Sequence, residues 1–537
     1  MQPGDIPPHL ASQSQLLRLR ERVQQKYGSF GNREDTGRVD LAAVMADTGL
    51  RTTIKIVAAV FFASLAASFV ASPEFEQFRL DVALVAFWGP VLYLYVVKPP
   101  LWSSARVFLT LALFIEPFSE AMFVTKGEGG YWNTVLWPAS VAFYGTIKEW
   151  SGAPGASLSL FTVVAGYLVY RAVGARKKPK GYVRPPDFAR FPLQLFAGAM
   201  ALFVVIGVVR GAPIEPAFRQ TYHMMQVPLA ALLFLHAIRT PHDLPAIGTI
   251  FVVAAVARSL LVAYIYFFIC VPNGIAPEWC TNHSDTVLFV TALLILVAHG
   301  LEQRKGKVIL KCLAIGTVIL AGIALNNRRL AFVSLGAAPV GMYLALKPSP
   351  RKTKVTILMT VLSVLAVAYV SIGSQIDSPS PLLKPARAVV SVMEQRDSSS
   401  KSRDIENENL IYTLKQSPLI GTGFGFEYKE EKNAVDLGVA FKDFKLIAHN
   451  GVLWIWSLLG VVGFTALWIL YPTTATLAVR GYRAAKTPLE RSASLASLGA
   501  VVVCIIQIWG DQGFLSYTTL VTFGVAYGVS ARLAEPT

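Results

Sequence analysis

Residues 308–325 read VILKCLAIGTVILAGIAL and residues 330–346 read LAFVSLGAAPVGMYLAL, with only the four residues NNRR between the two runs. A helix of roughly 17 to 25 apolar residues is long enough to cross a hydrocarbon core of about 30 Å. Each run therefore predicts a membrane-spanning helix. The polar residues 326–329 predict a tight hairpin between the two, with a re-entrant segment as the alternative.

Similar apolar runs recur along the chain. Of its 537 residues, 54% are hydrophobic and 15% are charged, which excludes an ordinary soluble domain and indicates a bilayer as the solvent. We expect an all-α membrane protein, a polytopic helical bundle of about 12–14 transmembrane helices. The expected spans are residues 53–71, 80–97, 106–124, 156–173, 192–209, 222–238, 246–269, 286–301, 308–325, 330–346, 355–373, 450–471, 493–510 and 514–531.

Orientation follows from the basic loops, because Lys and Arg near span ends are retained on the cytoplasmic side. The basic segments are residues 1–51, 176–180, 304–307, 351–354 and 480–491. They all fall on one side if both termini are cytoplasmic. The same bias, with contact to anionic membrane lipids, explains the net charge of +16, so we do not infer nucleic-acid binding.

This orientation divides the chain into four parts. They are a cytoplasmic basic tail at residues 1–51, a transmembrane bundle of about eleven spans at 52–373, one large outer loop domain at 374–449, and C-terminal transmembrane helices at 450–537. Cys270 and Cys280 flank a short outward loop, where a disulfide and two free thiols are both open alternatives.

Several basic side chains fall on the outer side, where the charge bias disfavours them. They are Arg210, Arg219, Arg328, Arg329, Arg403 and His449. Converging guanidiniums suit a membrane-anchored phosphate or diphosphate, through forked, charge-assisted hydrogen bonds. The alternative is pairing with carboxylates near the same span ends, namely Asp81, Glu116, Glu120, Glu215 and Asp511. Arg258 lies deeper, near mid-membrane, where a structural pair and a ligand contact are both open.

His449 is the strongest catalytic candidate, in Ala448-His449-Asn450-Gly451 where the outer loop enters a span. A neutral histidine can take a proton from an attacking hydroxyl. The neighbouring Asn450 also fits a helix cap. His283 and Asp285 share one loop, but two candidate ligands do not make a metal site, and we expect no metal or cofactor.

Four segments resemble the O-antigen ligase/polymerase family of bacterial envelope glycosyltransferases. They are Asn326-Asn327-Arg328-Arg329; Arg403 with the helix leading to the turn SPLIGTGFG at 417–425; Ala448-His449-Asn450; and LLGVVG at 458–463. Their order and spacing are those of the family, and the resemblance extends from about Leu193 to the C-terminus.

The resemblance implies a fold similar to the C-type glycosyltransferases, with a periplasmic loop, in a bacterial inner membrane. It implies inverting, metal-independent transfer or polymerisation of an undecaprenyl-diphosphate-linked glycan during cell-surface polysaccharide synthesis. The acceptor would be a glycan or the lipid A core, and other polysaccharide-assembly membrane proteins are candidate partners. His449 would activate the acceptor hydroxyl, and Arg210 and Arg328 would hold the diphosphate. Arg403 would be a secondary contact. Arg329 and Arg258 are further candidates for substrate binding.

The sequence does not separate a polymerase, a ligase and a protein O-oligosaccharyltransferase. The alternative from another class is a transporter or flippase for a lipid-linked or anionic substrate. Such a protein favours charged or broken helices at midplane in both halves of an internal repeat. Only Arg258 is deep, and no repeat is visible.

Overall fold

The computed structural model describes residues within a single unit of the chain, Val44–Thr537. The described residues are 100–115, 140, 143–146, 158–174, 186–272, 274, 279–376, 383, 386–387, 389–390, 398–433 and 443–535. The basic tail and the expected spans at 53–71 and 80–97 lie outside them, as do Asp81, Glu116 and Glu120.

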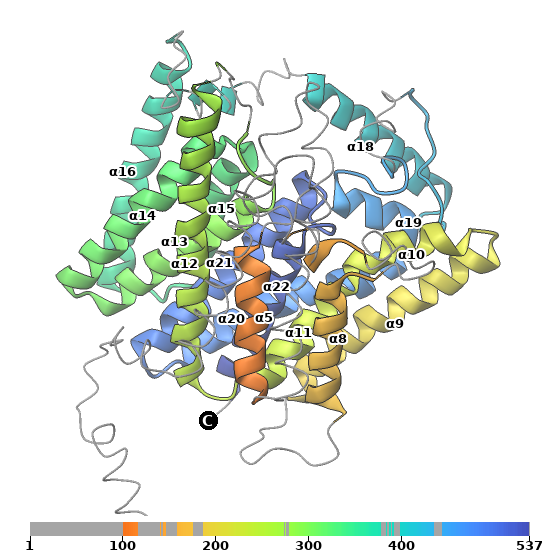
Figure 1. Cartoon of the computed structure of the whole chain (residues 1–537), viewed down its shortest axis with the longest axis horizontal. Coiled ribbons are helices and arrows are strands. Elements are labelled where there is room, and N and C mark those ends of the chain that lie inside the picture. The colour runs from red at the N-terminus through yellow and green to blue at the C-terminus, as the bar shows by residue number, and fades with distance from the viewer. Residues whose placement is uncertain are drawn as a thin grey trace, which may run out of the picture. The chain divides into compact units, whose positions relative to one another are not determined.

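The all-α fold class is confirmed, since the described residues form helices and no strand (Figure 1). The helices are α5 (Leu101–Phe114), α8 (Leu160–Val173), α9 (Asp187–Val209), α10 (Ile214–Met224), α11 (Gln226–Ala237), α12 (Leu244–Tyr264), α13 (Asp285–Gln303), α14 (Gly306–Asn326), α15 (Arg329–Ala345), α16 (Pro350–Gly373), α18 (Ser398–Gln416), α19 (Gly451–Trp468), α20 (Leu470–Ala484), α21 (Pro488–Gly510) and α22 (Tyr517–Leu533). A short 3₁₀ turn, η3 (Pro241–Asp243), precedes α12, and a π-helical turn, η4 (Ile265–Cys270), follows it.

Seven helical segments of the described chain are long and apolar enough to span a membrane, so the protein is a multi-pass membrane protein. They are Asp187–Val209, Pro241–Phe268, Asp285–Gln303, Gly306–Asn326, Lys352–Gly373, Gly451–Ala484 and Pro488–Gly510. Three shorter helices, α5, α8 and α15, are also apolar. Within α16, no residue of the most apolar stretch is buried, so this helix presents its apolar side chains outward, as a lipid-facing helix does.

Both expected hairpins with minimal loops are present. Asn327 joins α14 to α15 in the left-handed region, with φ of 50°, and Gln512 has the same φ between α21 and α22. The side-chain oxygen of Asn326 accepts backbone N–H bonds from Cys280 (3.0 Å) and Thr281 (2.9 Å), which fixes the first hairpin to the loop before α13. The segments after the two turns are the helices α15 and α22.

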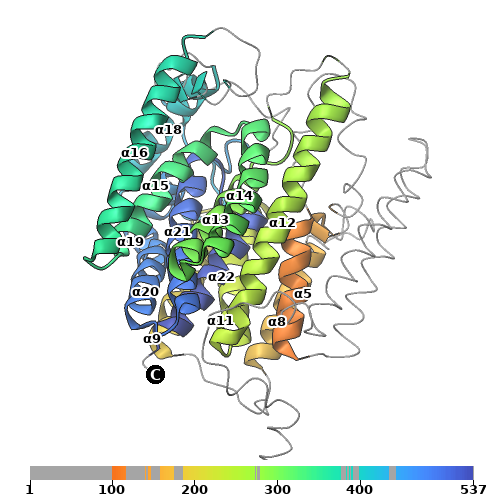
Figure 2. The same cartoon turned by 90° about the vertical axis from the view of Figure 1, so that its left-hand side faces the viewer.

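Helices α21 and α22 lie at the centre of the bundle, packed against α11, α13, α15 and α20. The described basic loops, which follow α13, α15 and α20, lie at one end, where Arg491 at the start of α21 donates to Glu302 at the end of α13 (2.9 Å) and Lys347 donates to the Arg483 carbonyl (3.5 Å). Helix α18 lies at the end opposite the C-terminus in both views (Figures 1 and 2). The bundle therefore has one end rich in basic loops and another end that carries α18.

The expected span at 450–471 differs from the structure. The helix continues through α20 to Ala484, and its backbone leaves the helical conformation at Gly460, where φ is 59° and ψ is −170°. The apolar run ends near residue 471, but the amphipathic sequence that follows still packs on the bundle and so remains helical. The break at Gly460 separates the first part of α19 from the longer helical piece that continues to Ala484.

Candidate functional site

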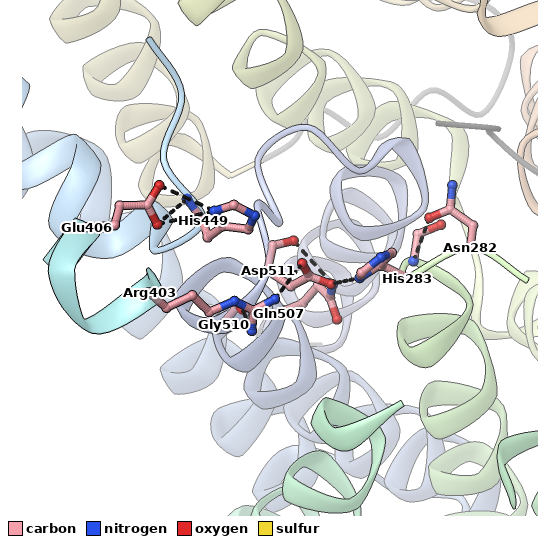
Figure 3. Close-up of polar contacts among 9 residues, drawn as sticks. Asn282, His283, Arg403, Glu406, His449, Gln507, Gly510 and Asp511 are labelled. Atoms are coloured by element: carbon pink, nitrogen blue, oxygen red, sulfur yellow. Dashed lines mark hydrogen bonds and ion pairs between the residues drawn. The ribbon is translucent and has the colours of Figure 1, made fainter. Parts of the chain in front are cut away.

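The candidate site lies where α18 meets the N-terminus of α19 and the C-terminus of α21. Arg403 and Glu406 are one turn apart on α18 and so share a face of that helix. Figure 3 shows Glu406 directed at His449, and Arg403 directed at Gly510 and Asp511. One helix, α18, thus supplies both a carboxylate and a guanidinium to the site.

His449 and Glu406 form a histidine–carboxylate pair. The imidazole Nδ1 lies 3.2 and 3.3 Å from the two carboxylate oxygens, and the backbone N–H of His449 donates to the same carboxylate at 3.1 Å. The Glu406 side chain is 8% exposed and that of His449 is 26% exposed. Because the carboxylate engages Nδ1, Nε2 is the nitrogen available for proton transfer.

The turn around His449 is fixed by its neighbours. The side-chain oxygen of Asn450 accepts the N–H of Leu453 (3.1 Å) and caps α19, as the sequence predicted. The amide of Asn450 donates to Asn407 on α18 (3.0 Å). On the other side, the N–H of Gln512 donates to the His449 carbonyl (2.8 Å). Hydrogen bonds to α18 and to the segment after α21 therefore fix the backbone that carries the imidazole.

Asp511 accepts from groups on two other segments. One carboxylate oxygen contacts His283 Nδ1, and the other lies 3.6 Å from Arg403 Nη2. The second arm of Arg403 donates to the carbonyl of Gly510 at 3.1 Å. Burial alone would raise the pKa of the Asp511 carboxyl, but its cationic neighbours outweigh burial and hold that pKa well below the ordinary value. Asp511 is therefore an ionised carboxylate in the site.

Arg328 approaches the same carboxylate from the hairpin between α14 and α15. It lies close enough to Asp511 to contribute to the lowered pKa of that carboxyl. Its guanidinium stacks over the ring of Trp279, with the guanidinium carbon 4.2 Å from the ring centroid. Arg329 is the first residue of α15. The structure therefore brings Arg328, Arg403 and His449 to one end of the bundle.

Arg210 caps the C-terminus of α9 and donates to the carbonyl of Gly421. Arg219, on the following helix α10, pairs with Asp443 and lies 4.0 Å from Glu215. Arg210 is thus held against the glycine turn at 417–425, whereas Arg219 has two carboxylate partners, of which the alternative interpretation expected Glu215 but not Asp443.

The glycine turn joins three backbones. Its carbonyls at Pro418 and Leu419 accept the N–H groups of Val461 (2.8 Å) and Val462 (3.1 Å), which the break at Gly460 leaves without helical partners. A Cβ added to Gly207 on α9 would lie 1.9 Å from the Phe424 carbonyl oxygen, and one on Gly460 would lie 2.4 Å from the Leu419 carbonyl carbon. Glycine is required where main chains cross this closely. The glycine turn at 417–425 therefore joins α9 and α19 through main-chain contacts.

Arg258 is buried in a pair with Asp285, which is two residues from His283. The Arg258 Nε is 3.4 Å from Asp285, and the two side chains are 3% and 1% exposed. A further arm donates to the carbonyl of Phe114 at 3.1 Å. This geometry favours the structural pair among the two expected roles. Cys270 and Cys280 are both buried free thiols, so the structure contains no disulfide between them.

Glu406 was not identified from sequence. It lies in the polar run RDIENEN at 403–409, where every residue looks equally suited to solvent. The one available signal was its spacing of three residues from Arg403, which puts both on one helical face. Asp511 and His283 were noted individually, but their contact spans 228 residues of sequence.

Comparison with known protein families gives one match. Residues 312–468 match a family model described as O-antigen ligase. The matched stretch runs from within α14 to the end of α19, and it contains Arg328, Arg403, Glu406 and His449. The resemblance found in the sequence is confirmed over this stretch. No curated protein matches the chain.

Proposed function

The chain carries an O-antigen ligase domain at residues 312–468, and we propose that it transfers or polymerises an undecaprenyl-diphosphate-linked glycan at the periplasmic face of a bacterial inner membrane. The family match itself implies a glycosyltransferase-type enzyme with a lipid-linked glycan donor and a polysaccharide acceptor. The single observation that supports the proposed chemistry is the imidazole of His449, held at Nδ1 by the buried Glu406 carboxylate.

In the proposed reaction, Nε2 of His449 takes the proton of an acceptor hydroxyl. The hydroxyl oxygen bonds to the anomeric carbon as the bond from that carbon to the diphosphate oxygen breaks. One displacement of this kind inverts the anomeric configuration. Glu406 acts as a positioning residue, because it holds the ring by Nδ1 and stabilises the imidazolium that forms.

The bonding electrons leave with the diphosphate, which therefore gains negative charge in the transition state. Arg328 and Arg403 approach the same region, and fixed guanidiniums stabilise such charge without reorganising. Arg210 remains a proposed further ligand, with one nitrogen already on the Gly421 carbonyl. Arg329 is a secondary candidate, and Arg258 is left out because it is buried with Asp285. The proposed reaction uses no metal.

The test is glycan transfer by the purified chain in nanodiscs, with a lipid-diphosphate-linked oligosaccharide as donor. We expect His449→Ala to lower the rate about 10²- to 10⁴-fold, the usual contribution of a general base. Arg328→Ala should also lower the rate. The acceptor is varied among a second lipid-linked glycan, lipid A core and a protein, because the product then separates polymerase, ligase and O-oligosaccharyltransferase.

Full transfer by both variants would overturn the proposed roles. A flippase would instead move the labelled donor across a liposome without forming a new glycosidic bond. The structure offers little for that alternative, because the deep Arg258 already has Asp285 and backbone carbonyls as partners.

A further inference from the structure

Asp511 occupies the position of an anion in a site built from cationic and donor groups. His283 Nδ1 contacts one of its carboxylate oxygens, and Arg403 Nη2 is 3.6 Å from the other. The Asp511 side chain is 11% exposed, whereas those of His283 and Arg403 are 35% and 39% exposed. The carboxylate is thus largely enclosed, while the groups around it are open to an incoming ligand.

The groups around this carboxylate come from separate elements. Arg403 comes from α18, His283 from the loop before α13, and Arg328 from the hairpin before α15. These three groups do not lie on one helix. Each of the three elements brings one group to the Asp511 carboxylate. A phosphoryl oxygen presents the same charge and acceptor geometry to such groups as a carboxylate oxygen does.

The proposed function assigns Arg328 and Arg403 to the diphosphate of the donor. The diphosphate and the Asp511 carboxylate are then two anions for one set of guanidinium nitrogens. They cannot both take the same arm of Arg403, and like charges at this separation repel each other. Either the donor diphosphate displaces the carboxylate from Arg403, or the carboxylate weakens the binding of the donor.

We propose that Asp511 is the resident counter-anion of the diphosphate site, which holds Arg403 while the site is empty and yields Arg403 to the diphosphate on donor binding. This inference rests on the proposed function. An unpartnered, partly buried guanidinium is costly, so the carboxylate keeps the empty site stable. By competing with the diphosphate it also limits donor affinity and favours release of the lipid diphosphate product.

Hydrogen bonds hold the main chain at Asp511 in place, so this exchange of anions involves only the Asp511 side chain. Asp511 N–H bonds to the Gln507 carbonyl (3.0 Å), and the N–H of the next residue, Gln512, bonds to the His449 carbonyl (2.8 Å). The main chain at 511 is therefore anchored on both sides. A substitution that removes the carboxylate charge should leave His449 in place, so its effect on diphosphate binding can be measured separately from catalysis.

The test uses Asp511→Asn and Asp511→Ser in the full chain in nanodiscs, with geranyl diphosphate as the probe, measured by calorimetry. Both variants remove the charge, and the second remains informative if the first does not fold. We expect the Kd for geranyl diphosphate to fall by up to about fivefold, the upper end of the effect of a single charge near the protein surface. The donor KM should fall in parallel, without a rise in kcat.

The matched control is Asp443→Asn, which is the same substitution on another carboxylate paired with an arginine, Arg219. Its Kd should equal that of the wild type. If the folded Asp511 variants bind the probe no more tightly than the wild type, the counter-anion role is wrong. Glycan transfer by the wild type and its loss in His449→Ala would still support the proposed function. If the wild type binds no diphosphate, the diphosphate site and the role of Asp511 are both wrong.

Discussion

Two arginine–aspartate pairs in this protein have nearly the same length and very different surroundings. Arg258 Nε lies 3.4 Å from Asp285, and Arg403 Nη2 lies 3.6 Å from Asp511. The first pair is 3% and 1% exposed, and the second is 39% and 11% exposed. Arg258 is also bonded to carbonyls at the C-terminal end of α5, so it is enclosed by protein, whereas Arg403 faces the region around His449.

The difference separates a structural ion pair from a candidate binding group. A buried pair is stable only while both partners remain, because either one alone is an uncompensated charge in a medium of low dielectric constant. A partly exposed pair can exchange one anion for another, since water and ligands reach it. Exposure, and not the identity of the residues, is what distinguishes the two roles.

The largest expected effect is on the buried pair. Arg258→Met should destabilise the protein by about 3–5 kcal/mol, because it leaves the Asp285 carboxylate without its partner. Thermal unfolding in nanodiscs measures this change. The double variant Arg258→Met with Asp285→Asn should recover much of the loss, and Arg403→Met should lower stability far less than Arg258→Met. Equal losses for both arginine variants would remove the distinction between the pairs.

A smaller effect is expected at the histidine–carboxylate pair. Glu406→Gln should lower kcat about 10- to 100-fold, less than His449→Ala, because the base remains but its orientation is less well fixed. The donor KM should stay unchanged, since Glu406 does not approach the diphosphate groups. Glu406→Asp, which keeps the carboxylate, should restore part of the rate. A loss confined to KM or to folding would contradict the positioning role.

Sequence predicted the parts of this molecule that depend on local composition. The spans at 308–325 and 330–346 correspond to α14 and α15, because two long apolar runs and a polar pair leave one arrangement in a bilayer. By contrast, α18 begins at Ser398, and its first turns are polar and lack the periodic apolar pattern that predicts a helix. This part gains its helical stability from tertiary packing, which local patterns do not record.

The site was predicted only in part, for a related reason. Arg328, Arg403 and His449 stood out as basic residues on the unexpected side of the membrane, and the structure places them at one end of the bundle. Asp511 was among the carboxylates expected to pair with them, whereas Glu406 did not stand out among the acids of its polar run. Which carboxylate meets which base depends on how α18 and α21 pack.

The next prediction concerns acid stability. The pKa of Asp511 is lower in the folded protein than in the unfolded chain, so the ionised group adds stability above about pH 4, the usual Asp pKa. This contribution is lost as the pH falls toward the lowered folded-state pKa. Melting temperatures measured from pH 7 down to pH 3 should therefore fall less steeply for Asp511→Asn than for the wild type. Parallel curves would contradict the lowered pKa.

The smallest effect is expected for a third pair, Arg219 with Asp443, whose side chains are 33% and 23% exposed. Arg219→Ala should lower the free energy of unfolding by less than about 1 kcal/mol, because water screens a pair at this exposure. It should also leave the donor KM unchanged, since Arg219 faces carboxylates of its own helix and of the outer loop. Kinetics and thermal unfolding of the same preparation measure both. A raised donor KM would assign diphosphate binding to Arg219, and exposure alone would then no longer distinguish ligand arginines from surface pairs.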